Sequence, residues 1–581
     1  MIDIKYSELL SLNRSLGKSM NSETYLVTIL SNITISQFNE IFEYALRLEG
    51  INGKVNSGEY DNILQDSLRY NKSDLVVIFW ELANIIDGLQ YKANLMDDAA
   101  VDALVLKVCN EIDFIVDSLK NTSLVIFNKF SSLVFNHANL KTNTFDNICI
   151  KLNNYLDQKV NSNFILIDID KVFAKISISK SIDLRYYYSS KALYSVEFYK
   201  HYSQYIIPVI RSVRGKAKKA IIFDCDNTLW KGILGEDGAD RIEMSGKTKA
   251  GVVFEEVQNL ALDLLKKGIL IGLCSKNNHQ DVETIIDEHP DMTIRNNNIA
   301  IKKVNWNDKA TNLKEIAAEL NIGLDSLVFV DDSEFETEYI KDTMPQITVL
   351  KVPLNLFEYP KLFRDYFSLF YNISQTKEDT NKTEMYIQEA KRVEEKSLFT
   401  DIDSYLQSLL LEITIYENSL EHIPRISQLT QKTNQFNLTT HRYTEADIKS
   451  FVYEGHYKVF AFDVNDKYGD YGLTGVCIVH LDPENKAADI NSLLMSCRVI
   501  GRNIERAFFD CLISRLKETG IDILRSKYIK TYKNEQVSDF YDKLGFICTK
   551  DHDGTKEYEI GLSNLKKQNI DYIKVNYGTE N

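Results

Sequence analysis

Short apolar runs alternate along the first part of the chain with segments in which apolar residues recur at helical spacing. Four runs predict buried strands: YLVTILSN (25–32), SDLVVIFWEL (73–82), SLVIFN (123–128) and NFILIDID (163–170). Between them, stretches such as QFNEIFEYALRLEG (37–50) have the apolar period of an amphipathic helix. This alternation predicts an α/β domain over residues 1–212, built on a parallel sheet.

The same rhythm returns between residues 217 and 372. Strands are predicted at AIIFD (220–224), ILIGLCSKNN (269–278), SLVFVDDSE (326–334) and ITVLKVP (347–353). Two segments between them, EEVQNLALDLLKKG and DKATNLKEIAAELN, are predicted to be helices. We therefore expect a second doubly wound sheet, in which ligands bind at the carboxyl ends of the strands.

The rest of the chain changes character twice. Residues 373–410 are charged with few apolar positions, which predicts a solvated linker helix. Residues 411–565 mix strand patterns (KVFAFDV, GLTGVCIVHL, ADINSLLMS) with helical ones (NIERAFFDCLISRLKETG), so this part is predicted to be α+β. Residues 566–581 are predicted to form a frayed tail. The chain as a whole is predicted to be a multidomain α/β protein.

Composition and charge narrow the class of protein. The 581 residues are 44% hydrophobic and 26% charged, as in ordinary globular proteins, and the net charge is −15. That charge argues against binding nucleic acid, whose phosphates attract clustered Lys and Arg. It also disfavours docking an acidic carrier protein, unless a local basic patch receives it.

Targeting signals and metal-binding cysteine patterns are not found in the sequence. No apolar run approaches the roughly 20 residues of a membrane span, and the first residues lack the pattern of a signal peptide. The eight cysteines are scattered. We therefore expect a cytoplasmic protein with reduced thiols and with neither a disulfide framework nor structural zinc.

Polar residues gather at predicted strand ends between residues 217 and 372. Asp224 and Asp226 follow the strand AIIF, and Asp331 and Asp332 end the strand SLVFV. Crowded carboxylates repel one another unless a cation lies between them. Mg2+ fits such a site, because it binds a few carboxylates and leaves its other positions to water and phosphate.

Two further residues complete this set. Ser275 stands at another strand end, and Lys309 stands at the start of a predicted helix. A hydroxyl and an ammonium can hold phosphate oxygens while the carboxylates hold a metal. Together these groups predict a site for phosphoryl transfer.

The order of these residues, DxDxT, then a strand-end Ser, a Lys and finally DD, resembles the haloacid dehalogenase superfamily of aspartate-nucleophile phosphotransferases. The resemblance implies that Asp224 is the nucleophile and Asp226 the general acid and base. It implies a phosphate-binding set consisting of Thr228, Ser275, Lys276, Asn277 and Lys309. It also implies a Mg2+ site made by Asp224, by Asp226 through its backbone carbonyl, and by Asp331 or Asp332.

Four longer stretches resemble one branch of that superfamily, the FkbH-like family: DNTLWKGILGEDG, CSKNN, KVNWNDKATNLKEIAAELNIGLDSLVFVDDSEFE and QLTQKTNQFNLTTHRYTEADI. The resemblance spans nearly the whole chain. It implies an enzyme that takes the glyceryl unit of 1,3-bisphosphoglycerate, removes phosphate and loads the acyl unit on the phosphopantetheine arm of an acyl carrier protein. Such loading serves secondary-metabolite or polyketide biosynthesis. The short insertion after EDG predicts an uncapped site that admits such an arm.

An acyl-transfer step raises the question of a thiol nucleophile, which needs a lowered pKa. Cys274 ends the strand ILIGLC directly before Ser275, where the resemblance places a thiol and where Mg2+ and Lys309 would favour the thiolate. Cys225 lies between two aspartates, so alternation along the strand turns its side chain the opposite way. Cys274 is therefore the predicted acyl nucleophile, against the alternative of an inert buried cysteine.

The last domain contains the segment SCRVIGRNIERAFFDCL, which resembles the pyrophosphate-binding loop of GNAT acyltransferases. The resemblance implies an acyl- or pantetheine-binding site at Arg498, Gly501, Arg502 and Asn503, where backbone N–H groups at a helix start meet phosphate. Asn503 departs from the small residue that this loop usually carries. The later segment NEQVSDFYDKLGF also resembles GNAT proteins. The alternative is a GNAT-like domain without chemistry of its own.

The first domain resembles SGNH hydrolases, which place a nucleophilic serine after the first strand. Ser31 occupies that position. These hydrolases also need an Asp-x-x-His pair near the end of the domain, and here Asp183 is followed by Tyr186 with no nearby His. Without a base to accept its proton, a serine is a weak nucleophile. We therefore expect this domain to be catalytically degenerate.

Two rival hypotheses accompany acyl loading. The first is a plain phosphatase of a small phosphorylated metabolite, in which Asp224 is needed and Cys274 is dispensable. The second is a non-enzymatic scaffold whose paired acidic motifs only bind metal. The scaffold leaves Ser275 and Lys309 without a purpose, so the two enzymatic hypotheses are preferred.

Overall fold

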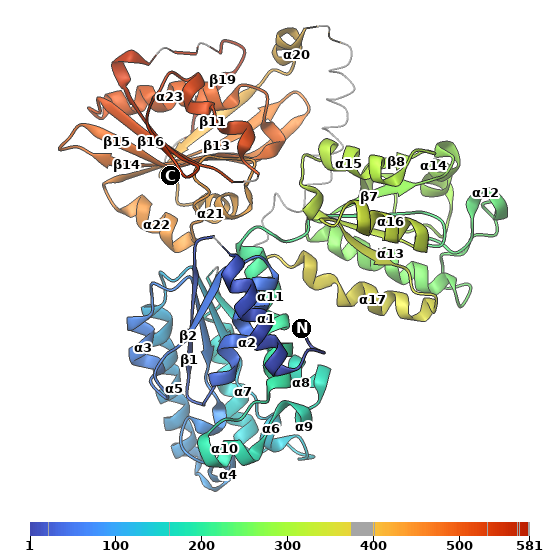
Figure 1. The fold of residues 1–581 in the computed structure, drawn as a ribbon, viewed down its shortest axis with the longest axis vertical. Helices are drawn as coiled ribbons and strands as arrows, with labels where there is room; N and C mark the ends of the chain where they lie inside the picture. The colour runs from blue at the N-terminus through green and yellow to red at the C-terminus, as the bar shows by residue number, and fades with distance from the viewer. Residues whose placement is uncertain are drawn as a thin grey trace. The chain divides into compact units, whose positions relative to one another are not determined.

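The computed structural model describes residues 1–581 except 21, 162, 374–398, 400, 532, 566, 569 and 579–581. The chain divides into two compact units, residues 1–210 with 443–447 and residues 211–442 with 448–581. Its strands form three sheets (Figure 1). The predicted multidomain α/β fold class is confirmed. Most of the predicted linker helix at 373–410 lies outside the described residues, and helix α20 (Ile402–Ser408) occupies its last part.

The first sheet has five parallel strands in the order β2-β1-β3-β4-β5. Their bounds are β1 (Tyr25–Ser31), β2 (Gly53–Ser57), β3 (Leu75–Phe79), β4 (Leu124–Asn128) and β5 (Phe164–Ile167). Strand β2 was not predicted, because Lys54 and Asn56 interrupt its apolar pattern. It stands at the edge of the sheet, where only part of a strand needs to be buried.

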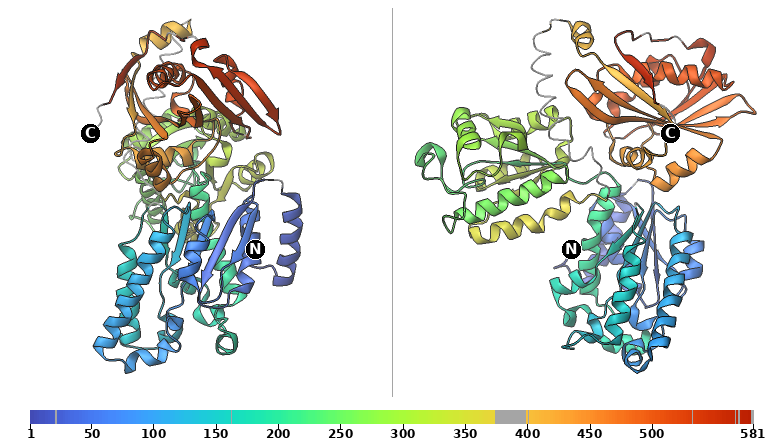
Figure 2. Two further views of the ribbon diagram at one scale, coloured as in Figure 1. Left: turned by 90° about the vertical axis from the view of Figure 1, so that its left-hand side faces the viewer. Right: turned by 180° about the vertical axis from the view of Figure 1, so that it is seen from behind.

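Helices cover both faces of this sheet (Figure 2). On one face, α5 (Asp98–Ser118) and α7 (Thr144–Asp157) bury apolar side chains against β3 and β4. On the other, Phe38 of α2 (Ser36–Leu48) contacts the rings of Phe79 and of Tyr199 and Tyr202 in α11 (Val196–Val213). A sheet covered on both faces explains why its strands read as continuous apolar runs.

The second sheet is also parallel, in the order β10-β9-β6-β7-β8. Its strands are β6 (Ala220–Phe223), β7 (Leu270–Ser275), β8 (Ile299–Val304), β9 (Leu327–Asp331) and β10 (Thr348–Lys351). Strand β8 was not predicted, because Lys302 and Lys303 break its apolar run. Both lysines bind glutamates of neighbouring helices, which satisfies their charge at the sheet edge.

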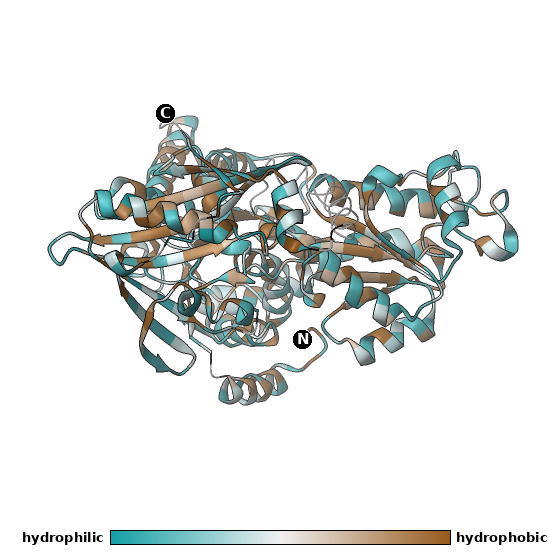
Figure 3. Ribbon diagram, turned by 90° about the horizontal axis from the view of Figure 1, so that it is seen from above, coloured by the Kyte–Doolittle hydropathy of each residue, from teal (hydrophilic) through white to brown (hydrophobic). Residues whose placement is uncertain are grey.

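Two layers of helices enclose the second sheet. One layer contains α13 (Gly251–Lys266), α14 (His279–Glu288) and α17 (Tyr359–Asp365), and the other contains α15 (Lys309–Glu319) and α16 (Glu334–Thr343). Ile221 and Phe223 pack toward the first layer, whereas Ala220 and Ile222 pack toward the second. Strand alternation therefore turns Asp224 toward α15 and α16. Figure 3 shows apolar residues concentrated on the strands of the sheets.

The third sheet is mixed and has nine strands, which confirms the predicted α+β character. Its main path contains β17 (Ile547–His552), β18 (Thr555–Gly561), β16 (Ile523–Ile529), β15 (Ala487–Met495), β14 (Gly469–Asp482), β13 (Tyr457–Asp466), β11 (Glu412–Glu417) and β19 (Lys574–Tyr577). Helix α23 (Ile504–Glu518) packs its apolar side chains into the same core. The prediction of a frayed tail is wrong over β19, which pairs with β11 through its backbone.

A short segment joins two strands of the third sheet that separate along their length. Strands β15 and β16 pair directly over only four residue pairs, from Ala487↔Ile523 to Ile490↔Ser526. Beyond that point the chain inserts β12 (Phe436–Asn437), which pairs with β15. The Leu438 N–H donates to the Leu493 carbonyl at 3.1 Å, and the Ile529 N–H donates to the Leu438 carbonyl at 2.8 Å. The segment NQFNLTT therefore bridges the two strands.

None of the helices in the described part of the chain has the length and apolar character needed to cross a bilayer.

Candidate active site

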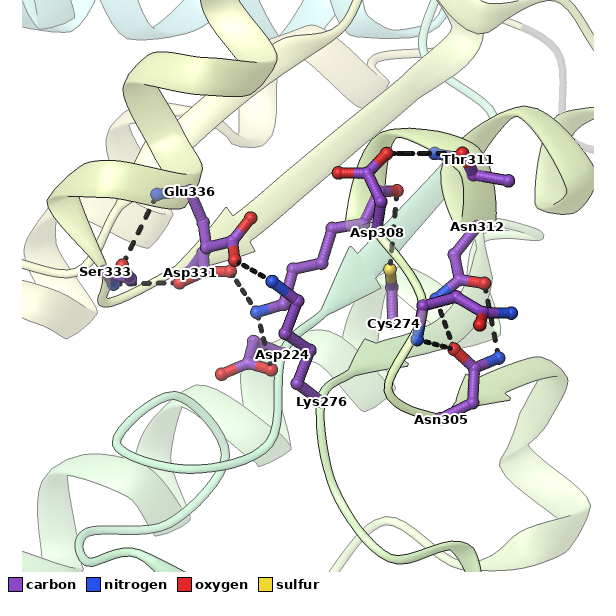
Figure 4. Close-up of polar contacts among 12 residues, drawn as sticks. Asp224, Cys274, Lys276, Asn305, Asp308, Thr311, Asn312, Asp331, Ser333 and Glu336 are labelled. Atoms are coloured by element: carbon purple, nitrogen blue, oxygen red, sulfur yellow. Dashed lines mark hydrogen bonds and ion pairs between the residues drawn. The ribbon is translucent and has the colours of Figure 1, made fainter.

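Asp224 is the first residue after the central strand β6, and its backbone is fixed by an N–H bond to Val330. Its side chain is buried, and its Oδ1 lies 3.0 Å from the Lys309 ammonium. The same ammonium lies 2.6 Å from Asp331 Oδ2 at the end of β9. Lys309 therefore joins the acidic ends of two neighbouring strands, where Figure 4 shows Asp224 and Asp331.

Local structure explains why Lys309 points into this cluster. It is the first residue of α15, whose N-terminus is capped by the Asp308 carboxylate accepting from the Thr311 N–H at 2.9 Å. Burial lowers the pKa of Lys309, but the charges of Asp224 and Asp331 outweigh this effect and leave its pKa raised. Lys309 therefore stays charged in the interior, as a buried ammonium does when it is paired with carboxylates.

Burial is the main influence on the pKa values of the three carboxyl groups of the cluster, and Lys309 offsets it only in part. Burial, with Asp224 close by, raises the pKa of Asp331 to about 6. Burial likewise raises the pKa values of Asp224 and Asp332. Three acids facing one ammonium leave negative charge uncompensated, which is the condition that a bound cation relieves.

A divalent metal fits this arrangement. Asp224, Asp331 and Asp332 form a group of possible metal ligands in which one oxygen from each lies within 4.8 Å of the others. The donors are all carboxylate oxygens, the ligand type that Mg2+ prefers. The structure thus brings together three of the four predicted metal residues through their side chains.

Asp226 uses its carboxylate differently. Its Oδ1 accepts from the Trp230 Nε1–H at 2.9 Å and from the Leu234 N–H at 3.0 Å, and its Oδ2 accepts from Asn277 Nδ2 at 2.8 Å. These three bonds fix the carboxylate outside the metal group. The prediction that Asp226 binds the metal through its backbone carbonyl is compatible with this arrangement. Trp230, which orients this side chain, was missed by the sequence analysis.

The predicted phosphate-binding residues lie around the same strand ends. Ser275 is buried, and its hydroxyl lowers the pKa of Asp224, which opposes the rise caused by burial. Thr228 is fully buried, and its Oγ1 has no hydrogen-bond partner among the described residues. Lys276 is more exposed and pairs with Glu336 of α16 at 2.6 Å. Glu336 was not singled out from the sequence, because an acid in the first turn of a helix is ordinary there.

The predicted acyl nucleophile does not have the environment expected for it. Cys274 is fully buried in the apolar layer beneath α15, and its Sγ lies 3.9 Å from the Lys309 backbone carbonyl. Burial raises the pKa of its thiol, although the charge of Lys309 opposes the rise, which is opposite to the lowered pKa that an acyl nucleophile needs. The role of Cys274 as acyl nucleophile stays a prediction. Cys225 packs in the opposite apolar layer, as strand alternation predicted. The side chain of Cys274 therefore lies next to the acidic cluster but is buried in the apolar layer under α15.

The four residues of the predicted phosphate-binding loop in the C-terminal domain differ in their contacts. Arg502 is buried and binds the Tyr471 hydroxyl, with Asp466 at 3.9 Å. Asn503 adopts φ 60° at the start of α23 and donates to the Tyr572 hydroxyl at 2.6 Å. Gly501 is exposed with φ 83°. Arg498 is half-buried, with its Nε 3.3 Å from the Ser496 hydroxyl. Arg502 and Asn503 therefore hold the fold of this loop.

In the described part of the first domain, the predicted serine has no histidine among its hydrogen-bond partners. Ser31 is buried, and its hydroxyl accepts from the Ile33 N–H at 3.1 Å. Asp183 caps α10 (Leu184–Ser190) and pairs with Arg185 at 2.6 Å. A catalytically degenerate domain remains our prediction.

A buried carboxyl in the first domain gives a prediction about stability. Glu81 is 5% exposed and accepts from the Tyr194 hydroxyl at 2.7 Å. Burial raises its pKa from 4.5 to about 7. Between these values the native state keeps a proton that the unfolded chain has lost, so the free energy of unfolding falls with rising pH, by about 3 kcal/mol at most. We expect Glu81→Gln to remove this slope.

Amide hydrogen exchange of β1 and β3 in the full chain, recorded from pH 5 to 8, measures how the free energy of unfolding changes with pH. Glu59→Gln, which changes an exposed glutamate of the same domain, is the matched control. An identical pH slope in wild type and Glu81→Gln would show that Glu81 does not hold a proton in the native state.

Comparison with known proteins adds information on the fold. No protein-family model matches the chain, and no curated protein matches it significantly. Among solved structures, the chain resembles the N-terminal part of the protein BF1531 from Bacteroides fragilis, described as containing a phosphatase domain complexed with Mg. The TM-score is 0.56 at 24% identity, over 64% of this chain and 100% of that chain. At this identity the likeness concerns the fold.

Weaker matches involve acetyltransferases. The ribosomal-protein-S18-alanine N-acetyltransferase of Escherichia coli matches 27% of this chain and 97% of its own, at 16% identity and a TM-score of 0.21. A mutant form of the spermidine/spermine N-acetyltransferase SpeG of Vibrio cholerae matches 26% of this chain and 94% of its own, at 12% identity and the same TM-score of 0.21. Scores this low support no functional conclusion.

Proposed function

We propose that this protein is a Mg2+-dependent phosphotransferase of the haloacid dehalogenase type, with Asp224 as its nucleophile. One observation carries the proposal: the buried Lys309 ammonium lies within 3.0 Å of both Asp224 and Asp331, next to a third carboxylate at Asp332. This set combines a nucleophile, a cation for phosphate oxygens and a metal site at one end of a parallel sheet.

The residues divide the reaction between them. An Asp224 oxygen attacks phosphorus while the bond from phosphorus to the leaving oxygen breaks, and Asp226 gives that oxygen a proton. Water then attacks phosphorus while the bond from phosphorus to the Asp224 oxygen breaks, Asp226 accepts the proton of the water, and inorganic phosphate leaves. Ser275 and Lys309 hold the nonbridging oxygens. Asp224, Asp331 and Asp332 would hold Mg2+, which would supply charge neutralisation for the phosphoryl group.

We further propose that the substrate is 1,3-bisphosphoglycerate and that the product is a glyceryl unit loaded on an acyl carrier protein. The sequence resemblance to the FkbH-like family supports this reading. Trp306 and Phe335, which stand three residues along the sequence from Lys309 and Asp332, are 75% and 74% exposed. Aromatic side chains are enriched in protein–protein interfaces, so these two are candidates for contact with a carrier protein.

Acyl transfer needs a thiol. The Cys274 thiolate would attack the acyl carbonyl carbon, the bond to the phosphate oxygen would break, and the thioester would pass to the pantetheine thiol. Because Cys274 is fully buried under α15, this attack requires the first turn of α15 to move. The alternative is a plain phosphatase of a small phosphorylated metabolite, which needs no such movement.

Intact-mass analysis separates these functions. The protein is incubated with 1,3-bisphosphoglycerate, Mg2+ and a carrier protein bearing phosphopantetheine. We expect a glyceryl adduct on the carrier in wild type and its loss in Cys274→Ala, with Cys225→Ala as the matched buried control. Free phosphate with no adduct on protein or carrier would establish the plain phosphatase instead.

A further inference from the structure

The ion pair between Lys276 and Glu336 connects elements on either side of the proposed nucleophile. Lys276 directly follows β7, and Glu336 lies in the first turn of α16, which follows β9. In the order β9-β6-β7, the strand that carries Asp224 lies between them. Neighbouring strands are about 4.8 Å apart. The 2.6 Å contact between Lys276 Nζ and Glu336 Oε1 therefore spans the end of β6 (Figure 4).

Glu336 has the properties of a residue that positions Lys276. Its side chain is 9% exposed, compared with 39% for Lys276. The Ser333 hydroxyl accepts from its backbone N–H at 3.3 Å, which fixes the first turn of α16. Its second oxygen, Oε2, is buried without a hydrogen-bond partner among the described residues. A buried carboxylate with one ammonium partner holds that ammonium firmly, because separating them leaves an unpaired buried charge.

The two lysines of the site differ in depth. The side chain of Lys309 is 5% exposed, and its ammonium is shared between Asp224 and Asp331. Lys276 is the outer cation, and among the described residues its side chain pairs with Glu336. An ammonium has three donors, so Lys276 can bind a further anion without leaving Glu336.

Given the proposed function, we infer that Lys276, positioned by Glu336 across the end of β6, binds a second anionic group of the substrate. The phosphoryl group that reacts must reach the buried Asp224, where Ser275 and Lys309 contact it. A cation at the outer edge instead contacts the remainder of the substrate. The pair thus selects substrates that carry an anionic group in addition to the transferred phosphoryl group.

The test compares two stable phosphate esters that differ at one end. 3-Phosphoglycerate carries a carboxylate, and glycerol 3-phosphate carries a hydroxymethyl group in its place. We expect Lys276→Met to lower the kcat/KM for 3-phosphoglycerate, divided by that for glycerol 3-phosphate, by at least tenfold. The main change should be a higher KM for 3-phosphoglycerate, because a charge-assisted hydrogen bond to its carboxylate is lost. Lys341→Met serves as control, because it removes an exposed lysine–glutamate pair, Lys341 with Glu338, within α16, the helix that carries Glu336.

A conservative change distinguishes positioning from structural support. Glu336→Gln keeps an oxygen that accepts from Lys276 but removes the negative charge that competes with the substrate. We expect it to retain the preference for 3-phosphoglycerate. A loss of that preference equal to the loss in Lys276→Met would overturn the inference, as would a kcat/KM ratio in Lys276→Met unchanged from the Lys341→Met control.

A binding measurement separates this inference from the proposed function. Calorimetric titration with 3-phosphoglycerate in Mg2+ measures binding without turnover when both proteins also carry Asp224→Asn, and we expect at least tenfold weaker binding when Lys276→Met is added. If wild type released no phosphate while this difference in affinity remained, the proposed function would fail and the inference would stand. Turnover by wild type with equal affinities in the two proteins would overturn the inference alone.

Discussion

Asp224→Asn is expected to reduce phosphate release by about 10^4-fold or more, because an amide cannot act as the nucleophile that accepts the phosphoryl group. The variant should remain folded. Burial raises the pKa of Asp224, so removing its charge relieves repulsion with Asp331 and Asp332. Steady-state phosphate release with glycerol 3-phosphate, together with thermal unfolding, measures both effects.

Asp263→Asn provides a matched control for this experiment. Asp263 belongs to α13 in the same domain and pairs at the surface with Lys267 at 2.7 Å. We expect this change to leave phosphate release within twofold of wild type, since exposed ion pairs contribute about 1 kcal/mol or less. An Asp224→Asn protein that retained more than about one tenth of wild-type activity would exclude Asp224 as the nucleophile.

Lys309→Met should have the second-largest effect, and it acts on both stability and activity. Without the ammonium, Asp224 and Asp331 remain buried with no charge partner, which costs about 3–5 kcal/mol. Phosphate release should fall about 10^2- to 10^3-fold, because a preorganised cation for the phosphoryl oxygens is lost. Amide hydrogen exchange of β6 and β9 reports the stability change.

Magnesium should restore part of the stability that Lys309→Met loses, because binding to the native state shifts the folding equilibrium. Wild type should gain less from the same Mg2+ concentration. Lys314→Met, an exposed change on the same helix, should alter neither property. Equal stabilisation of the Lys309→Met and wild-type proteins by Mg2+ would show that the three carboxylates do not hold the ion.

Much of the site was predictable because parallel strands end together. Asp224, Ser275 and Asp331 each follow an apolar run, and the sheet topology brings these ends side by side. Strand alternation also predicted that Cys225 faces away from the cluster, into the apolar layer that includes Phe223. These inferences needed only the strand period and the rule that ligands bind at carboxyl ends.

The environment of Cys274 was not predictable in the same way. Its position on β7, beside the end of β6, follows from the sequence, and it does neighbour the cluster. What covers it depends on where α15 packs, and Ala310 and Leu313 place an apolar surface over the sulfur. Likewise, Glu336 gains its partner Lys276 across the sheet, 60 residues away in sequence. A contact between residues so far apart in sequence leaves no pattern in the sequence around either residue.

The bridge at Leu438 has a consequence for dividing the protein. Strands β15 and β16 diverge after Ile490 and Ser526, and the chain from Phe436 to Leu438 satisfies backbone groups of both. A fragment starting at residue 443 would leave these groups as two open sheet edges facing a gap. Open edges recruit strands from other molecules and promote aggregation. The smallest autonomous C-terminal piece must therefore begin upstream of the NQFNLTT motif.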